Sequence, residues 1–417
     1  MTCCTRLAER IVIAALLAGA PATPARSVRL AGEAAFAALE TPGARASIAA
    51  EIPADAALVE YAVVGRPGEA GPRYAACVLR HGAAPSIVDL GDAAGIDSAI
   101  AAMRAALRDP RRDDVVARGR AVYARVVRPL VRAIGSSTRL LISPDGELNL
   151  VPFEAMVDDR GRYLVESFTT TYLASGRDLL AMRVPRESHT GPAVFADPLF
   201  GEPRPRAGRP SAPFYFAPLP ATAGEARTIK ALFPDATIFA GPHATKAALQ
   251  RVDAPRMLHI AAHGFFLDAA RARAVDPLLR SGIALAGANL PNAHRSAILT
   301  AVDAARLNLW GTKLVTLSAC DTGIGDVRNG EGVYGLRRAF ARAGTETLVM
   351  TLWPVGDAIA RETMVAYYVE LRAGLGRGDA LRNAKLGILR KPARSHPYYW
   401  AAFIQSGEWA PLERTRR

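Results

Sequence analysis

Two stretches decide the fold: RMLHIAAHG at residues 256–264 and KLVTLSACDTG at residues 313–323. Each is a near-continuous apolar run that ends in small residues, and a third such run, ETLVMTLW, occupies 346–353. Between the second and the third lies VYGLRRAFARA (333–343), whose apolar residues recur at helical spacing. Apolar strands that alternate with helices are typical of a mostly parallel sheet covered on both faces. The pattern therefore predicts an α/β fold for this half of the chain.

The residues that follow the first two strands carry reactive side chains. The first strand leads into His263 and Gly264, and the second leads into Cys320 and Asp321. If the strands are neighbours, His263 and Cys320 face each other, because the carboxyl ends of parallel strands meet at one edge of the sheet. An imidazole can accept the thiol proton and later return it to a leaving amine. The backbone N–H groups of Gly264 and Cys320 are candidate donors to an oxyanion.

The order and spacing of this pair favour one kind of cysteine chemistry. His263 precedes Cys320 by 57 residues, close to the spacing of roughly fifty in caspase-type proteases. The local caspase signature around the cysteine is absent, because SACDTG stands there. The alternative is that Cys320 is an inert buried thiol. The histidine at the end of the partner strand favours the catalytic pair.

A second histidine, His259, raises the question of a metal site. His259 and His263 form an H-x-x-x-H pattern, but Ile260 occupies the position where zinc proteases carry a glutamate. Four residues along a strand span about 13 Å, too far for shared ligation. We therefore expect no metal, and expect His259 in the core or directly behind the site.

The N-terminal half has its own α/β pattern. Residues 57–64 and 73–80 predict paired strands, and 96–108 and 113–134 predict helices. Residues 139–142 predict a further strand that runs into a turn. This smaller α/β region shows no catalytic constellation, and we expect it to buttress the second half.

Three segments outside the strands also carry local signals. Residues 201–213 (GEPRPRAGRPSAP) have the composition of a mobile loop. Thr222 and Glu225 fit a capping box that opens the helix ARTIKALF. Thr245 is a candidate cap for a second helix, KAALQRV.

The first 26 residues resemble a leader. Arginines precede the short apolar run IVIAALLAGA, and Ala20-Pro21-Ala22 fits a cleavage site. The sequence thus favours three parts: a signal peptide at 1–26, an N-terminal α/β part at 27–185 and a catalytic domain at 186–417. Export, for example to a periplasm, is slightly favoured over a cytoplasmic location. The alternative is an ordinary amphipathic helix or a misplaced start codon.

Composition excludes several other classes. Charged residues make up 22% of the chain and hydrophobic residues 50%, which is typical of a globular protein. The net charge of +13 comes from scattered arginines without a basic and aromatic stripe, so we expect no nucleic-acid partner. Four cysteines form neither a disulfide framework nor a zinc pattern. The apolar runs are too short to predict a membrane span.

The sequence resembles the CHAT domains of bacterial caspase-like proteins, relatives of caspases and separases. The resemblance covers roughly residues 55–410, and SACDTG with AAHG upstream and LWPVGD downstream is a specific combination. The matching pieces are LLISPDGELNLVPFEAM (140–156), YLASGRDL (172–179), LHIAAHG (258–264), LVTLSACDTGIGDVRNGEG (314–332), LRRAFARAGTETLVMTLWPVGD (336–357), ALRNAK (380–385) and HPYYWAAFIQSGE (396–408).

This resemblance implies a caspase–haemoglobinase-like fold and a His–Cys dyad that falls on His263 and Cys320. In the related separases, an acidic residue after a tryptophan lines the pocket for a basic P1 side chain, and the matching position here is Asp357. The alternative for Asp357 is an N-cap for the helix AIARETMVAYYVEL. Asp321, beside the nucleophile, is a further candidate for substrate contact. Family members are often joined to tetratricopeptide repeats, which are not visible here.

The function that these features favour is a cysteine endopeptidase that cleaves protein or peptide substrates, with preference for a basic P1 residue and without a cofactor. One alternative is a catalytically silent or partner-gated caspase-like signalling module that binds a regulatory protein. A second alternative is a thiol acyltransferase, but the sequence shows no phosphate-cradling loop for an acyl donor. The sequence does not predict an oligomeric state.

Overall fold

The computed structural model describes residues 44–64, 71–202, 215–266, 281–290, 296–318 and 331–413. The expected leader at 1–26 and most of the expected loop at 201–213 lie outside these ranges. So do Cys320 and Asp321. Among the described helices, none is long and apolar enough to cross a membrane.

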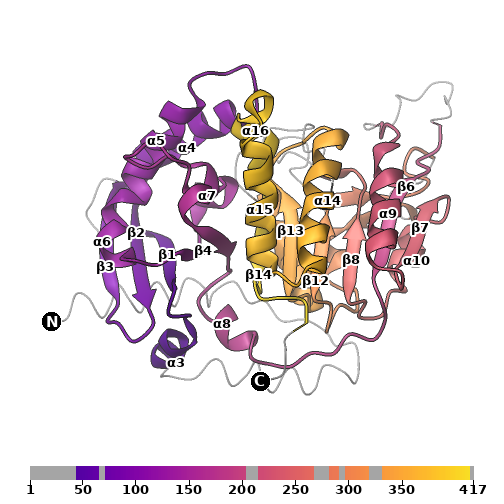
Figure 1. Cartoon of the computed structure of the whole chain (residues 1–417), viewed down its shortest axis with the longest axis horizontal. Helices are drawn as coiled ribbons and strands as arrows, with labels where there is room; N and C mark the ends of the chain where they lie inside the picture. The colour runs from indigo at the N-terminus through magenta and orange to yellow at the C-terminus, as the bar shows by residue number, and fades with distance from the viewer. Residues whose placement is uncertain are drawn as a thin grey trace.

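A single large sheet runs through both halves of the protein (Figure 1). Its eleven described strands follow the order β3-β2-β1-β4-β5-β14-β13-β12-β8-β6-β7. Their bounds are β1 Ala56–Val64, β2 Arg73–Arg80, β3 Ser86–Asp92, β4 Arg139–Ser143, β5 Thr169–Tyr172, β6 Ala193–Pro198, β7 Thr237–Gly241, β8 Met257–Ile260, β12 Leu314–Leu317, β13 Thr347–Thr351 and β14 Phe403–Gly407.

The sheet contains two groups of parallel strands that run in opposite directions. Strands β1, β4, β5 and β14 are mutually parallel. Strand β14 is antiparallel to β13, and β13, β12, β8, β6 and β7 are parallel to one another. The carboxyl ends of β8, β12 and β13 therefore lie at one edge of the sheet, and those of β4, β5 and β14 lie at the opposite edge.

Helices cover both faces of the sheet, which confirms the predicted α/β fold. On one face lie α9 (Ala221–Leu232), α14 (Asp357–Arg372) and α15 (Arg377–Leu389), drawn in front of the strands in Figure 1. The other face is covered by α10 (Lys246–Leu249), α12 (Ala301–Ala304) and α13 (Glu331–Ala343). Alternate residues of β8 serve the two faces: Leu258 shares a cluster with Phe340 of α13, and Met257 shares one with Tyr367 of α14.

The N-terminal elements match the prediction except for one helix. Strands β1 and β2 form the expected pair and run antiparallel, and α4 spans Ala93–Leu107. The single helix expected over 113–134 is wrong: α5 ends at Val126, and a 3-10 turn over Arg128–Leu130 precedes the short α6, Val131–Ile134. Pro129 explains the break, because proline lacks a backbone N–H and disfavours helical geometry in the residue before it.

The capping box predicted at Thr222 and Glu225 is also wrong. Helix α9 begins at Ala221, after Pro220, so both residues lie inside it. The Thr222 hydroxyl donates to the Leu219 carbonyl, while Glu225 is buried against the sheet. The predicted cap at Thr245 is confirmed, since its side chain accepts from the Ala248 N–H, although α10 ends early, at Leu249.

Beyond β8 the chain forms a small antiparallel sheet that the sequence did not predict. Its strands are β9 (Gly264–Phe266), β10 (Ser281–Ala284) and β11 (Ile298–Thr300), in the order β11-β10-β9. The backbone of β10 also reaches His263, because the Ala284 N–H donates to the His263 carbonyl. This sheet therefore holds the residue that follows β8 in place.

Candidate functional site

The two strands that lead to the predicted catalytic pair are neighbours. Strand β8 pairs in parallel with β12, and Ile260 lies opposite Leu317. His263 follows β8 by three residues, and Ser318 immediately follows β12. The predicted nucleophile, Cys320, and its neighbour Asp321 lie outside the described residues, so the structure gives no distance from them to His263.

The His263 ring is buried and held by a backbone carbonyl. Its exposed fraction is 8%, and its Nε2 atom lies 2.8 Å from the Ala217 carbonyl oxygen. A carbonyl oxygen only accepts hydrogen bonds, so Nε2 must carry the proton. In the neutral ring this leaves Nδ1 unprotonated and able to act as a base.

Aromatic rings surround this histidine and fix its plane. The rings of Phe200 and Phe216 lie 5.3 Å and 5.8 Å from the His263 ring, measured between centroids. The buried side chain of Asn289 joins the two segments that carry these rings. Its carbonyl accepts from the Phe216 N–H, and its amide donates to the carbonyls of Phe216 and Gly201. Asn289 therefore also fixes the segment that presents the Ala217 carbonyl.

A buried polar network lies directly behind the ends of β8 and β12. His259 on β8 and Glu225 on α9 are 1% exposed, and His259 Nε2 lies 3.1 Å from Glu225 Oε1 in an ion-pair contact. On its other side, His259 Nδ1 lies 2.9 Å from the Tyr368 hydroxyl, which itself donates to Thr316 Oγ1. The two nitrogens of the His259 ring thus face the Tyr368 hydroxyl and the Glu225 carboxylate.

The same carboxylate reaches the strand end next to the predicted nucleophile. Ser318 Oγ donates to Glu225 Oε2 over 3.3 Å, and the Ser318 N–H donates to the Ile260 carbonyl. Ser318 is two residues before Cys320. Sequence reasoning missed Glu225 because its spacing from Thr222 matched a helix cap. It also missed Ala217, because a backbone carbonyl leaves no signature in residue type.

Asp357 lies at the same edge of the sheet. It is the first residue of α14, and the N-cap position belongs to Gly356, so the alternative role of Asp357 as N-cap is not observed. Burial raises the pKa of the Asp357 carboxyl, a nearby His263 charge lowers it, and Glu225 raises it. The half-buried Asp357 carboxylate therefore interacts electrostatically with both His263 and Glu225. A cation bound there would relieve the cost of its desolvation.

The remaining predictions concern Gly264 and metals. Gly264 is the first residue of β9 and lies opposite Ile283 of β10, directly beside the candidate base. Within the ranges that the structure describes, no group of three or more His, Cys, Asp or Glu side chains is arranged to hold a metal ion.

Comparison with known proteins identifies the relatives of this chain. Residues 116–408 match the family model described as CHAT domain. Tetratricopeptide repeat protein 28 of Mus musculus is 36% identical over 113 residues, which cover 27% of this chain and 4% of that protein. The Homo sapiens protein of the same name is 36% identical over 110 residues, covering 26% and 4%. The chain thus spans a small part of these curated relatives.

Two solved structures are similar at low sequence identity. The Saccharomyces cerevisiae separase–securin complex gives a TM-score of 0.47 at 7% identity, covering 88% of this chain and 31% of that chain. The Arg-specific cysteine proteinase gingipain R gives a TM-score of 0.40 at 8% identity, covering 77% of this chain and 75% of that chain.

Proposed function

Because the chain belongs to the CHAT domain family, as its motifs predicted, we propose that it is a cysteine endopeptidase with His263 as base and Cys320 as nucleophile. The family match and the helix-flanked sheet also confirm the expected caspase-like fold class. The observation that carries the proposal is the hydrogen bond from His263 Nε2 to the Ala217 carbonyl, because it leaves Nδ1 as the basic nitrogen.

Chain connectivity supports the approach of the thiol to this base. Strand β12 ends beside β8, and only Ala319 separates Ser318 from Cys320. Two residues span at most about 7 Å, and this short connection supports the proposal that the Cys320 thiol reaches His263. The network of Glu225 and His259 contacts the ends of both β8 and β12. These contacts support a fixed position for Ser318, from which the chain continues to Cys320.

In the proposed reaction, His263 Nδ1 takes the proton of the Cys320 thiol. The thiolate attacks the peptide carbonyl, and the backbone N–H groups of Gly264 and Cys320 stabilise the oxyanion. The C–N bond then breaks, and the Nδ1–H proton passes to the leaving amine, which leaves a thioester. Water, deprotonated by Nδ1, hydrolyses the thioester and regenerates the thiol. The Ala217 carbonyl stabilises the imidazolium that forms in both steps, because it accepts the other ring N–H.

We further propose that Asp357 selects a basic P1 side chain, with Asp321 as a second contact to the substrate. The partly desolvated carboxylate of Asp357, at the edge that carries His263, supports a site for an arginine or lysine. A charge-assisted, bidentate hydrogen bond to a guanidinium would be stronger than the contact with an ammonium. The proposal therefore favours arginine over lysine at P1.

A protein partner that regulates the enzyme is part of the proposal. The curated relatives carry the name tetratricopeptide repeat protein, and the chain matches 4% of their length. Because repeat solenoids present extended binding surfaces, a relative of that kind supports regulation through protein contacts.

The test is cleavage of a fluorogenic peptide library, varied at P1, by the full-length protein, with Cys320→Ala and His263→Asn as controls. We expect cleavage after arginine by the intact protein, and a loss of at least 1,000-fold in kcat/KM in both variants. Equal cleavage by Cys320→Ala would defeat the proposal.

If none of the three proteins cleaves the library, a second measurement is needed. This is the rate at which a P1-arginine acyloxymethyl ketone peptide labels Cys320. Labelling of the intact protein that depends on His263 would support a partner-gated peptidase. Labelling no faster than that of free cysteine would favour the non-catalytic binding module.

A further inference from the structure

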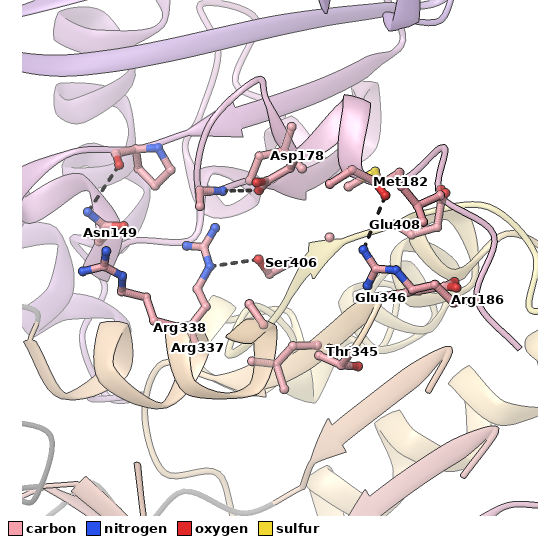
Figure 2. Close-up of a pocket in the computed structure, with 18 of the residues that line it drawn as sticks. Asn149, Asp178, Met182, Arg186, Arg337, Arg338, Thr345, Glu346, Ser406 and Glu408 are labelled. Atoms are coloured by element: carbon pink, nitrogen blue, oxygen red, sulfur yellow. Dashed lines mark hydrogen bonds between the residues drawn. The ribbon is translucent and has the colours of Figure 1, made fainter. Parts of the chain in front are cut away.

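A cavity of about 470 Å³ lies at the seam between the two halves of the protein. Its upper wall in Figure 2 comes from the loops after β4 and β5 and from α8 (Asp178–Ala181), and its floor comes from α13. The amino end of β13 and the carboxyl end of β14 close the remaining side, with Glu346, Ser406 and Gly407. This volume is in the range of sites for small molecules, which commonly form between structural units.

The position of the cavity follows a general rule of α/β sheets. Ligands bind beyond the carboxyl ends of parallel strands. Pro144 and Asp145 follow β4, Leu173 and Ala174 follow β5, and all four line the cavity. Since β14 is parallel to β5 but antiparallel to β13, this carboxyl edge is opposite to the one that carries His263. The N-terminal half therefore has a ligand-sized site at its own carboxyl edge.

Two guanidinium groups of α13 enter this cavity. Arg337 is 7% exposed, its Nε atom donates to Ser406 Oγ, and its guanidinium lies 5.8 Å from the centre of the Tyr172 ring. Arg338 is exposed and projects from the next position toward Asn149 (Figure 2). A pair of guanidiniums at one end of a cavity matches the oxygens of a carboxylate or a phosphate.

The carboxylates of the lining are already bound by protein donors. Asp145 accepts from the backbone N–H groups of Val63 and Gly146, and Asp178 accepts from that of Ala174. Glu346 accepts from Lys313 and Arg377, and Glu408 accepts from the N–H groups of Trp409 and Ala410. These carboxylates therefore already accept hydrogen bonds from the protein. Burial raises the pKa of Asp178, and the charges of Arg337 and Arg186 lower it.

Apolar side chains also line the cavity, beside the polar side chains of Arg186, Glu346 and Glu408. Met182 and Val184 line it from the segment after α8, Leu348 lines it from β13, and Ala341 lines it from the last turn of α13. A ligand that consisted only of a charged group would leave these apolar side chains in contact with water.

From this arrangement we propose that the seam cavity binds a small organic anion, a carboxylate or phosphate monoester, whose apolar body packs on Met182, Val184 and Leu348. Arg337 and Arg338 hold the anionic group. The site bridges both halves, so its occupation stabilises the folded protein by linkage. The inference is independent of the peptidase proposal, since it uses none of the residues assigned to catalysis.

The test uses three fluorinated probes of similar size with the full-length protein: 4-(trifluoromethyl)benzoate, 4-(trifluoromethyl)phenyl phosphate and 4-(trifluoromethyl)benzylamine. Binding is measured from the broadening of the ¹⁹F resonance and from the shift in Tm. Ala341→Phe fills the cavity from an exposed position and should fold, while Arg338→Gln removes one cation. Arg342→Gln is the matched control, because Arg342 lies on the same helix, is exposed and does not line the cavity.

We expect at least one of the two anions to bind the wild-type protein and the Arg342→Gln control, and to raise Tm by several degrees at saturation. Its affinity should fall at least tenfold in Ala341→Phe and in Arg338→Gln, and the amine should not bind. The proposal is overturned if neither anion binds, if the amine binds as well as the anions, or if Ala341→Phe binds the anions as tightly as wild type does.

Discussion

The buried carboxylate of Glu225 contacts residues of two neighbouring strand ends. It faces His259 on β8 and accepts from Ser318 after β12, and both of its partners are 1% exposed. Replacement by alanine would leave the buried His259 ring and the Ser318 hydroxyl without their shared partner, which costs about 2–6 kcal/mol for the two unsatisfied groups. We expect Glu225→Ala to lower the free energy of unfolding by that amount, as measured by urea denaturation.

The isosteric variant Glu225→Gln separates the effect of the carboxylate charge from that of the side-chain shape. Glu225→Gln keeps an oxygen for Ser318 and loses only the charge opposite His259, so we expect a smaller loss of stability than for alanine, together with slower labelling of Cys320. Ser318→Ala, which removes one hydrogen bond, is the matched control and should cost about 1 kcal/mol. If Glu225→Gln were as stable and as reactive as wild type, the ion pair would have no positioning role.

Asp357 gives a prediction in which the sign of the pH dependence matters. Burial raises its pKa, so the folded state holds its proton to higher pH than the unfolded state does. The ionised carboxylate therefore destabilises the unliganded protein above that raised pKa, and the penalty disappears as pH falls toward the unfolded value of about 4. We expect Asp357→Asn to raise Tm at pH 7.5 and to lose this advantage at pH 4.5.

The same substitution should have the opposite effect on substrate. Asp357→Asn removes the proposed partner of a P1 arginine, so kcat/KM for that substrate should fall about 10- to 100-fold, with little change for an uncharged P1 residue. Melting curves at the two pH values and kinetics with the two substrates check the two effects separately. A loss that is equal for both substrates would argue against a role in specificity.

At the scale of elements, Asn289 fixes the segment that presents the Ala217 carbonyl to His263. Its side chain makes three hydrogen bonds to the backbone of Phe216 and Gly201. We expect Asn289→Ala to lower stability by about 2–3 kcal/mol, because buried backbone groups lose their partners. It should also lower kcat more than it changes KM, since the base loses its orientation. Asn308→Ala, which loses one exposed hydrogen bond to Asp253, should leave kcat unchanged.

The same scale shows what the sequence could predict. Apolar runs and helical periodicity were sufficient for β8, β12, β13 and α13, and they predicted the edge at which His263 lies. Local patterns failed where another interaction decided the outcome, as at Pro129 and at Glu225, where a buried ion pair outweighs a cap. Ala217 and Asn289 act through backbone groups and long-range contacts, which residue type alone does not reveal.

At the scale of the whole molecule, the two halves share a hydrophobic core but little backbone pairing, and a buried ion pair lies at their junction. Strands β5 and β14 pair through Ser406 and Tyr172 alone. Lys385 on α15 lies 2.6 Å from Glu154, both are almost fully buried, and Glu154 also accepts from the Tyr172 hydroxyl. We infer that this pair couples the folding of the N-terminal half to that of the C-terminal half.

Lys385→Met tests this coupling, because it leaves Glu154 charged and buried without its partner, at a cost of about 3–5 kcal/mol. All four tryptophans lie between residues 310 and 409, so their fluorescence reports on the C-terminal half, whereas far-ultraviolet circular dichroism reports on both halves. We expect the two urea transitions to coincide in wild type and to separate in Lys385→Met.

Lys385→Met combined with Glu154→Gln removes the unpaired charge and keeps an acceptor for Tyr172, so it should recover much of the stability. If the double variant were no more stable than Lys385→Met, the loss would come from packing of the lysine stem, and the buried charge would not be what joins the halves.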